Sequence, residues 1–163
     1  MKIKRILVPV DFSAHAQAAL DYSIEFGRPF KAEILVLHVV EPIYYAVPDF
    51  TGGTAASMVS LLEEQRRAAR AELIRLEHTY ARRRVKLRTL LQTGVTAYEA
   101  IVDTARKLKA DLIVMATHGR TGLTHLLMGS VAEHVVRSAV CPVLTLRAGK
   151  MPRRKAVKRK KRS

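Results

Sequence analysis

The sequence is poor in cysteine and has no long hydrophobic run, and both absences narrow what the chain can be. Its 163 residues include one cysteine, Cys141, which alone can form neither an internal disulfide nor a metal site. The neighbours of Cys141 are apolar, so we expect a buried and unreactive thiol. Apolar runs such as Leu112–Ala116 are far shorter than the roughly 18 residues that suggest a membrane span.

The sequence also lacks a secretion signal and the common phosphate-, dinucleotide- and metal-binding motifs. The opening, MKIKRILVPVDF, has a short apolar stretch interrupted by charge and proline, and it has no small-residue cleavage site. We therefore expect a cytoplasmic protein. The chain lacks the phosphate loop GxxxxGK followed by Ser or Thr, it lacks GxGxxG, and no two histidines have the spacing of a two-ligand metal site beside an acid.

Positive charge is concentrated at the carboxyl terminus. The formal net charge is +15, and residues 150–163 hold nine of the 29 Lys and Arg residues and no acid. We expect a folded domain over residues 1–148 and a disordered basic tail over residues 149–163. The tail could bind nucleic acid, polyphosphate or anionic lipid weakly and without sequence preference, or it could serve solubility alone.

The hydrophobic pattern predicts strands that alternate with helices. Nearly continuous apolar runs indicate strands buried on both faces, and one run that alternates with charged residues indicates an edge strand. The expected strands are residues 3–8, 33–40, 85–91, 111–117 and 142–146, of which 85–91 and 142–146 lie at edges; the expected helices are 13–27, 57–81, one from 96 that includes 108, and 130–139. This order predicts an α/β fold with a five-stranded, mostly parallel, doubly wound, Rossmann-like sheet and helices on both faces.

Polar residues mark the starts of three of these helices. Ser13 is placed to cap the first helix. Thr96 with Glu99, and Ser130 with Glu133, have the spacing of a capping box, in which each side chain binds the other residue's backbone N–H.

Ligands of doubly wound sheets bind at the carboxyl ends of the strands, where the strand order reverses. The segments that follow the first and fourth strands, residues 9–13 and 116–130, are therefore the candidates. The second reads ATHGRTGLTHLLMGS, and its Gly129-Ser130 opens a helix directly. Free N–H groups, the helix dipole and the Ser130 hydroxyl would favour an anion there, although the same residues also suit a plain turn and cap.

Histidines flank the same loop. His118 and His125 could act as a base or a cationic donor near phosphates. No carboxylate stands at a useful spacing from them, and Glu133 is expected to serve the helix cap. The pattern therefore favours binding over catalysis, and His38, in a buried strand, is expected to be a satisfied core residue.

Four segments together resemble the universal stress protein family. They are ILVPVDFS, LHVV, the run IVMATHGRTGLTHLLMGSVAEHVV and CPVLTL, and the resemblance covers about residues 2–147. ATP-binding members have Gly, two residues, Gly, nine residues, then Gly followed by Ser or Thr. Here Gly119 and Gly129-Ser130 match, but Ala116 stands in the first position. Its methyl group would be costly if the backbone there needs a positive φ and mild otherwise.

The resemblance implies an ATP- or adenine-nucleotide-binding protein with a regulatory role in the stress response and little or no hydrolysis. It places Asp11 by the ribose and adenine, Val39 by the adenine, and Ser130 with the Val131 N–H by phosphates. Mg²⁺ would come with the nucleotide. The expected nucleotide-binding residues are Pro9, Val10, Asp11, Val39, Met115, Ala116, His118, Gly119, Arg120, Gly129, Ser130 and Val131.

Other interpretations stay open. Ala116 would suit a dimeric interaction protein of the same fold that binds no nucleotide, and the resemblance to adenine nucleotide α-hydrolase-like domains permits a slow ATPase. Asp11 could instead serve only the local turn beside Ser13. Members of the family pair their last strands, which implies a homodimer through about Val143–Leu146. The loop 41–56 could fold over the nucleotide or be a surface loop or dimer contact.

Overall fold

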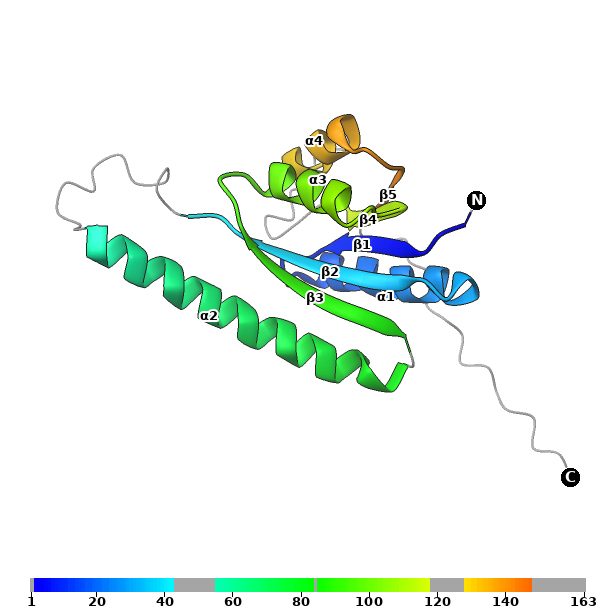
Figure 1. Ribbon diagram of the computed structural model, residues 1–163, viewed down its shortest axis with the longest axis horizontal. Coiled ribbons are helices and arrows are strands. Elements are labelled where there is room, and N and C mark those ends of the chain that lie inside the picture. Colours follow the sequence, from blue (N-terminus) through cyan, green and yellow to red (C-terminus); the bar gives the residue numbers. More distant parts are fainter. Residues whose placement is uncertain (1, 43–54, 84, 118–127, 148–163) are drawn as a thin grey trace, which may run out of the picture.

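The computed structural model describes residues 2–42, 55–83, 85–117 and 128–147. In these residues five strands form one sheet in the order β3-β2-β1-β4-β5, and every pairing is parallel (Figure 1). The strands are β1 (Arg5–Pro9), β2 (Glu33–Val40), β3 (Lys86–Thr93), β4 (Leu112–Ala116) and β5 (Val143–Leu146). The helices are α1 (Ala14–Gly27), α2 (Ala55–Tyr80), α3 (Ala97–Lys107) and α4 (Ser130–Ser138). The predicted α/β fold and both edge strands are confirmed.

Two hydrophobic cores lie on opposite faces of the sheet, because successive strand residues point to opposite sides. On one face Val8, Val36 and Val114 pack with α1 and α2; on the other Leu7, Leu35 and Ile113 pack with α3 and α4. Figure 1 shows α3 and α4 above the sheet and α2 below it. The central strands are therefore buried on both sides, as their unbroken apolar sequences predicted.

Helix α1 begins and ends as the sequence predicted. The Ser13 Oγ accepts the N–H of Ala16 at 3.2 Å, which caps the first turn. Gly27 ends the α-helix, and a Cβ there would lie 3.0 Å from the Cδ1 of Ile6, so a larger residue would require the end of that side chain to shift. A short 3-10 turn (Arg28–Phe30) follows the α-helix, and Lys31 after it has a φ of 53°.

The two predicted capping boxes are wrong in detail. Thr96 is the N-cap of α3, but its hydroxyl donates to the Glu99 carboxylate at 2.7 Å instead of accepting a backbone N–H. Gly129, not Ser130, is the N-cap of α4, because the Glu133 N–H binds the Gly129 carbonyl at 3.0 Å. Ser130 is thus the first helical residue, and its N-cap, Gly129, has no side chain that could cap this helix.

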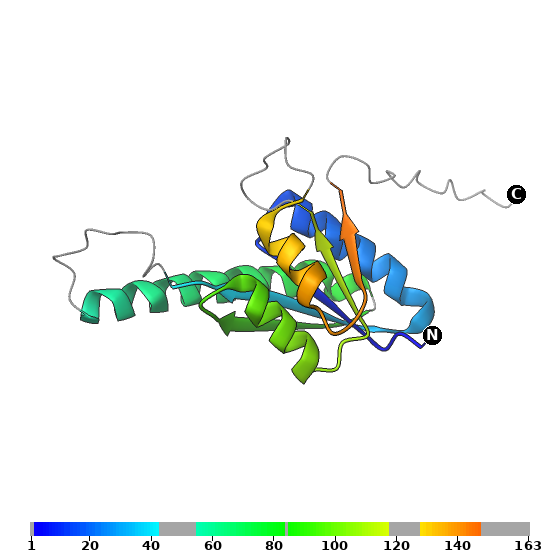
Figure 2. The same ribbon diagram turned by 90° about the horizontal axis from the view of Figure 1, so that it is seen from above.

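Helix α2 is the longest element and extends past the sheet at its amino-terminal end (Figure 2). It is also polar over most of its surface. No helix in the described ranges is long and apolar enough to cross a membrane.

Candidate functional site

The site predicted from the sequence lies where the strand order reverses. Strands β1 and β4 are neighbours in the sheet, yet the chain leaves β1 toward β2 and leaves β4 toward β5. The segments that follow them therefore lie side by side at the carboxyl edge. The predicted residues that the structure describes all lie at this edge: Pro9, Val10, Asp11, Val39, Met115, Ala116, Gly129, Ser130 and Val131. His118, Gly119 and Arg120 lie outside the described residues, as does most of the loop 41–56.

The turn after β1 is held by residues of β2. The Val10 N–H donates to the Leu37 carbonyl at 2.8 Å, and the His38 Nδ1 lies 2.7 Å from the Val10 carbonyl. Because a carbonyl oxygen only accepts, this His38 nitrogen carries the proton. The Phe12 ring packs at a tilt against the His38 ring, with 4.3 Å between centroids, and its φ of 62° is unusual for a residue with a side chain of this size. These contacts hold Phe12 in its left-handed conformation.

Asp11 takes part in the local turn that the sequence left as an alternative. Its Oδ1 accepts the N–H of Ser13 at 3.0 Å and the Ser13 hydroxyl at 2.6 Å. This contact orients the carboxylate beside the start of α1. The two interpretations of Asp11 are compatible, since a carboxylate offers about four acceptor positions.

The end of β4 and the start of α4 are joined directly. The Gly129 N–H donates to the Thr117 carbonyl at 2.7 Å, and the Thr117 N–H donates to the Leu146 carbonyl of β5 at 2.9 Å. Gly129 has a φ of −73°, which any residue can adopt. The lack of a side chain at Gly129 therefore matters because it leaves the N–H groups of the helix start uncovered. Ala116 is not among the described residues with positive φ, so its methyl group brings no backbone strain.

Three of the predicted nucleotide-binding residues divide between the two faces of the sheet. Val39 and Met115 belong to the core beside α3 and α4, the face on which α4 begins. Val10 is buried in the other core, and both of its backbone polar groups are bonded to β2. Val10 therefore positions the turn and does not present its side chain to the α4 face.

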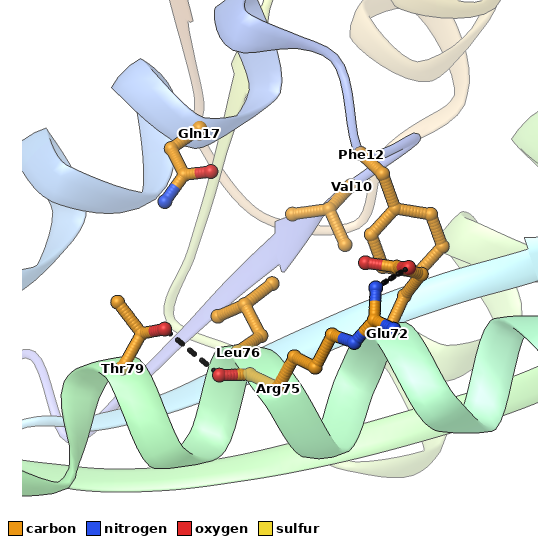
Figure 3. A pocket seen from close by; sticks show the side chains of 7 residues that line it. All are labelled: Val10, Phe12, Gln17, Glu72, Arg75, Leu76 and Thr79. Atoms are coloured by element: carbon orange, nitrogen blue, oxygen red, sulfur yellow. Dashed lines mark hydrogen bonds and ion pairs between the residues drawn. The ribbon is translucent and has the colours of Figure 1, made fainter.

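A cavity of about 170 Å³ lies on the opposite face, between the β1–α1 turn and α2 (Figure 3). Its polar groups are already paired: Arg75 binds Glu72 at 2.7 Å, and the Thr79 hydroxyl donates to the Arg75 carbonyl at 2.8 Å. The volume is below the 300–1,000 Å³ typical of small-molecule sites. This cavity was not predictable from the sequence, because α2 and the turn are far apart in the chain.

The next features are the possible metal ligands and the single thiol among the described residues. Among the described residues, no group of three or more His, Cys, Asp or Glu side chains is placed to hold a metal ion. Cys141 is half-buried, less than predicted, and burial followed by the charge of Asp111 raises the pKa of its thiol. A raised pKa lowers the thiolate fraction at neutral pH, in line with the predicted low reactivity.

Comparisons with known proteins agree with the fold and with the motifs. The model of the universal stress protein family matches residues 2–147. Universal stress protein MJ0531 of Methanocaldococcus jannaschii is 37% identical over 151 residues, which cover 90% of this chain and 84% of that protein. The structure of UspA from Lactobacillus plantarum superposes with a TM-score of 0.77 at 26% identity and covers 90% of this chain and 99% of that one. The chain therefore belongs to the universal stress protein family.

A more distant member was solved with a ligand. The universal stress protein from Archaeoglobus fulgidus in complex with dAMP is 24% identical, with a TM-score of 0.52, and covers 89% of this chain and 98% of that one. At this identity the likeness establishes the common fold.

Proposed function

We propose that this protein binds ATP or a closely related adenine nucleotide at the carboxyl edge of β1 and β4, and that it acts by binding and not by turnover. The observation that carries the proposal is the uncapped start of α4. The N–H groups of Ser130, Val131 and Ala132 precede the first intrahelical bond, and among the residues that the structure describes no side chain caps them. Three N–H groups at the positive end of a helix dipole suit a phosphate.

The adenosine half would lie along the ends of β1, β2 and β4. Asp11 would accept hydrogen bonds from the ribose or the adenine amine, and Val39 and Met115 would contact the base. The remaining proposed contacts are Pro9, Ala116, His118, Gly119, Arg120 and Gly129. Val10 would contribute by positioning the turn that carries Asp11. An adenine nucleotide is favoured because a protein that shares the fold holds dAMP.

Regulation is favoured over catalysis by the chemistry near α4. Glu133, the acid in the first turn, is paired with Arg137 at 3.1 Å, and main-chain N–H groups bind phosphate without supplying a base. We therefore propose a cytoplasmic regulator in the stress response that hydrolyses ATP slowly or not at all. Mg²⁺ would enter with the nucleotide. This would be contradicted if the unaltered chain released phosphate from ATP at a measurable rate and the His118→Ala variant did not.

A homodimer through β5 is part of the proposal. Strand β5 is an edge strand and its four residues, Val143–Leu146, are all partly exposed, so a second copy could extend the sheet there. Sedimentation equilibrium should give twice the chain mass, and a monomer at every concentration would exclude the pairing. Limited proteolysis should trim the proposed basic tail, residues 149–163, and leave a core that ends near residue 148.

The variant Ser130→Glu tests the phosphate site. A glutamate in the first turn interacts favourably with the helix dipole and stabilises the helix by about 0.3–1 kcal/mol, so α4 should still form. The same charge should repel phosphates, so the rise in melting temperature with millimolar ATP and Mg²⁺ should be lost.

Ser138→Glu is the matched control, because it makes the same change at the other end of α4. It should keep the response to ATP. If Ser130→Glu keeps it as well, the phosphates do not bind at α4.

A further inference from the structure

The amino edge of the sheet, opposite to the proposed nucleotide site, gathers positive charge around a cavity. Because all five strands are parallel, the segments that enter them meet at one edge although they are far apart in the sequence. There a cavity of about 320 Å³ is lined by Lys4, Arg5, Phe30, Lys31, Glu33 and Lys86. The register places Lys86 beside Glu33, and Glu33 beside Arg5, so the lining crosses three neighbouring strands.

Two acids lie near this cavity, and both have polar partners. Glu33 lies 3.9 Å from the Nε of Arg88, a further cation at the same edge. Asp111 accepts the backbone N–H groups of Lys4 and Arg5 at 2.7 and 2.9 Å. Within the described ranges no ion pair involves the side chain of Lys4, Lys31 or Lys86. The cavity therefore has an excess of cationic groups over acids.

Two lysines at this edge occupy positions where the backbone favours glycine. Lys31 precedes β2 with φ of 53°, and Lys109 precedes β4 with φ of 50°. A left-handed residue after a helix is usually glycine, since a Cβ is unfavourable there. The chain has a long cationic side chain at both positions, although glycine would fit the backbone better. This favours a functional role for the positive charge at this edge.

An exposed aromatic ring completes the cavity. Phe30 is 45% exposed, and its ring is 5.7 Å from that of Phe26, which in turn stacks on Tyr22 at 6.0 Å. The ring is thus supported by α1 and lines the same cavity as the lysines. Proteins bind single-stranded nucleic acid by this combination, in which cations contact phosphates and an aromatic face stacks on a base.

We propose that the amino edge of the sheet binds single-stranded nucleic acid, with phosphates on Lys4, Lys31 and Lys86 and a base on Phe30. This site is separate from the nucleotide site. It is also separate from the last described residue, Arg147, because β5 ends at the opposite edge. Binding should depend on salt and not on base sequence.

Fluorescence anisotropy of a labelled oligothymidylate with the full chain tests the proposal. Lys31→Gly removes a charge and relieves the left-handed backbone, so it should keep or raise the melting temperature while it weakens binding several-fold and reduces the salt slope by about one. Lys86→Ala should behave likewise. Phe30→Ala should weaken binding by roughly tenfold, the scale of one lost base stack. Arg67→Ala, an equal loss of charge on the exposed side of α2, is the control and should have little effect.

Three outcomes would overturn the proposal. The first is that the full chain does not bind the oligonucleotide at low salt. The second is that Lys31→Gly and Lys86→Ala bind as Arg67→Ala does, which would assign the binding to another surface. The third is that the lysine variants weaken binding, Phe30→Ala does not, and inorganic polyphosphate competes fully with the oligonucleotide. That result would make the amino edge a general polyanion site.

Discussion

At the scale of single residues, His38 has the clearest structural role near the proposed site. It is 8% exposed, its Nδ1 donates to the Val10 carbonyl, and its ring supports Phe12. The sequence suggested only a satisfied core histidine. The structure adds that it holds the turn that carries Asp11.

Replacing His38 should therefore affect both stability and binding. His38→Leu removes the donor to the buried Val10 carbonyl, which should lower the free energy of unfolding by about 1–3 kcal/mol, as urea denaturation would measure. ATP binding should weaken too, because the Asp11 turn loses its support.

His38→Asn is the informative comparison. Its side-chain amide nitrogen can occupy the position of Nδ1 and donate to the same carbonyl. It should recover part of the lost stability. Equal stability of the Leu and Asn variants would show that the hydrogen bond has no such role.

The backbone conformations of Ala116 and Phe12 could not be predicted from the sequence. Ala116 departs from the family motif, and only its backbone conformation could decide whether the departure matters; its φ is not positive. Phe12 has the opposite property, a positive φ that its side chain disfavours. That conformation depends on contacts with β2, which lies more than twenty residues away in the chain, so no local rule could have predicted it.

At the scale of elements, the start of α4 is the feature on which the proposed function depends. A capping box would have occupied the N–H groups that phosphate needs. With Gly129 at the cap position, those groups keep their binding capacity.

Gly129→Asn should separate helix stability from binding. An asparagine cap would accept the N–H of Val131 or Ala132 and stabilise α4 by a few tenths of a kcal/mol without adding charge. It should weaken ATP binding at least tenfold in isothermal titration, because it competes for the phosphate donors. Unchanged affinity in a variant of equal or higher melting temperature would argue against main-chain recognition of phosphate.

Strands and helices were predictable because their signals are local. The apolar run Glu33–Val40 coincides with β2, and Ser13 caps α1 as its position suggested. The capping boxes at Thr96 and Ser130 were wrong because the same spacing also fits a helix that begins one residue earlier or a hydroxyl that donates to the carboxylate. The choice depends on contacts with distant residues, such as the Gly129 N–H with the Thr117 carbonyl and the Ala97 N–H with the Glu41 carboxylate, which the spacing does not contain.

At the scale of the whole molecule, the two edges of the parallel sheet have different surfaces. Among the described residues, the carboxyl edge offers a helix start without a side-chain cap and an oriented carboxylate, and the amino edge offers lysines without an ion pair around an exposed ring. Alternation of strands and helices predicted the first edge, since strand order reverses there. The second could not be predicted, because its residues come together only through the register of β1, β2 and β3.

Mass analysis of the nucleotide released by denaturing freshly purified protein tests the central claim most directly. A protein that binds ATP or a relative at the carboxyl edge should release an adenine nucleotide in an amount comparable to the protein, and Ser130→Glu purified in parallel should release little. Release of none by the unaltered chain, together with no rise in its melting temperature in millimolar ATP and Mg²⁺, would contradict the claim.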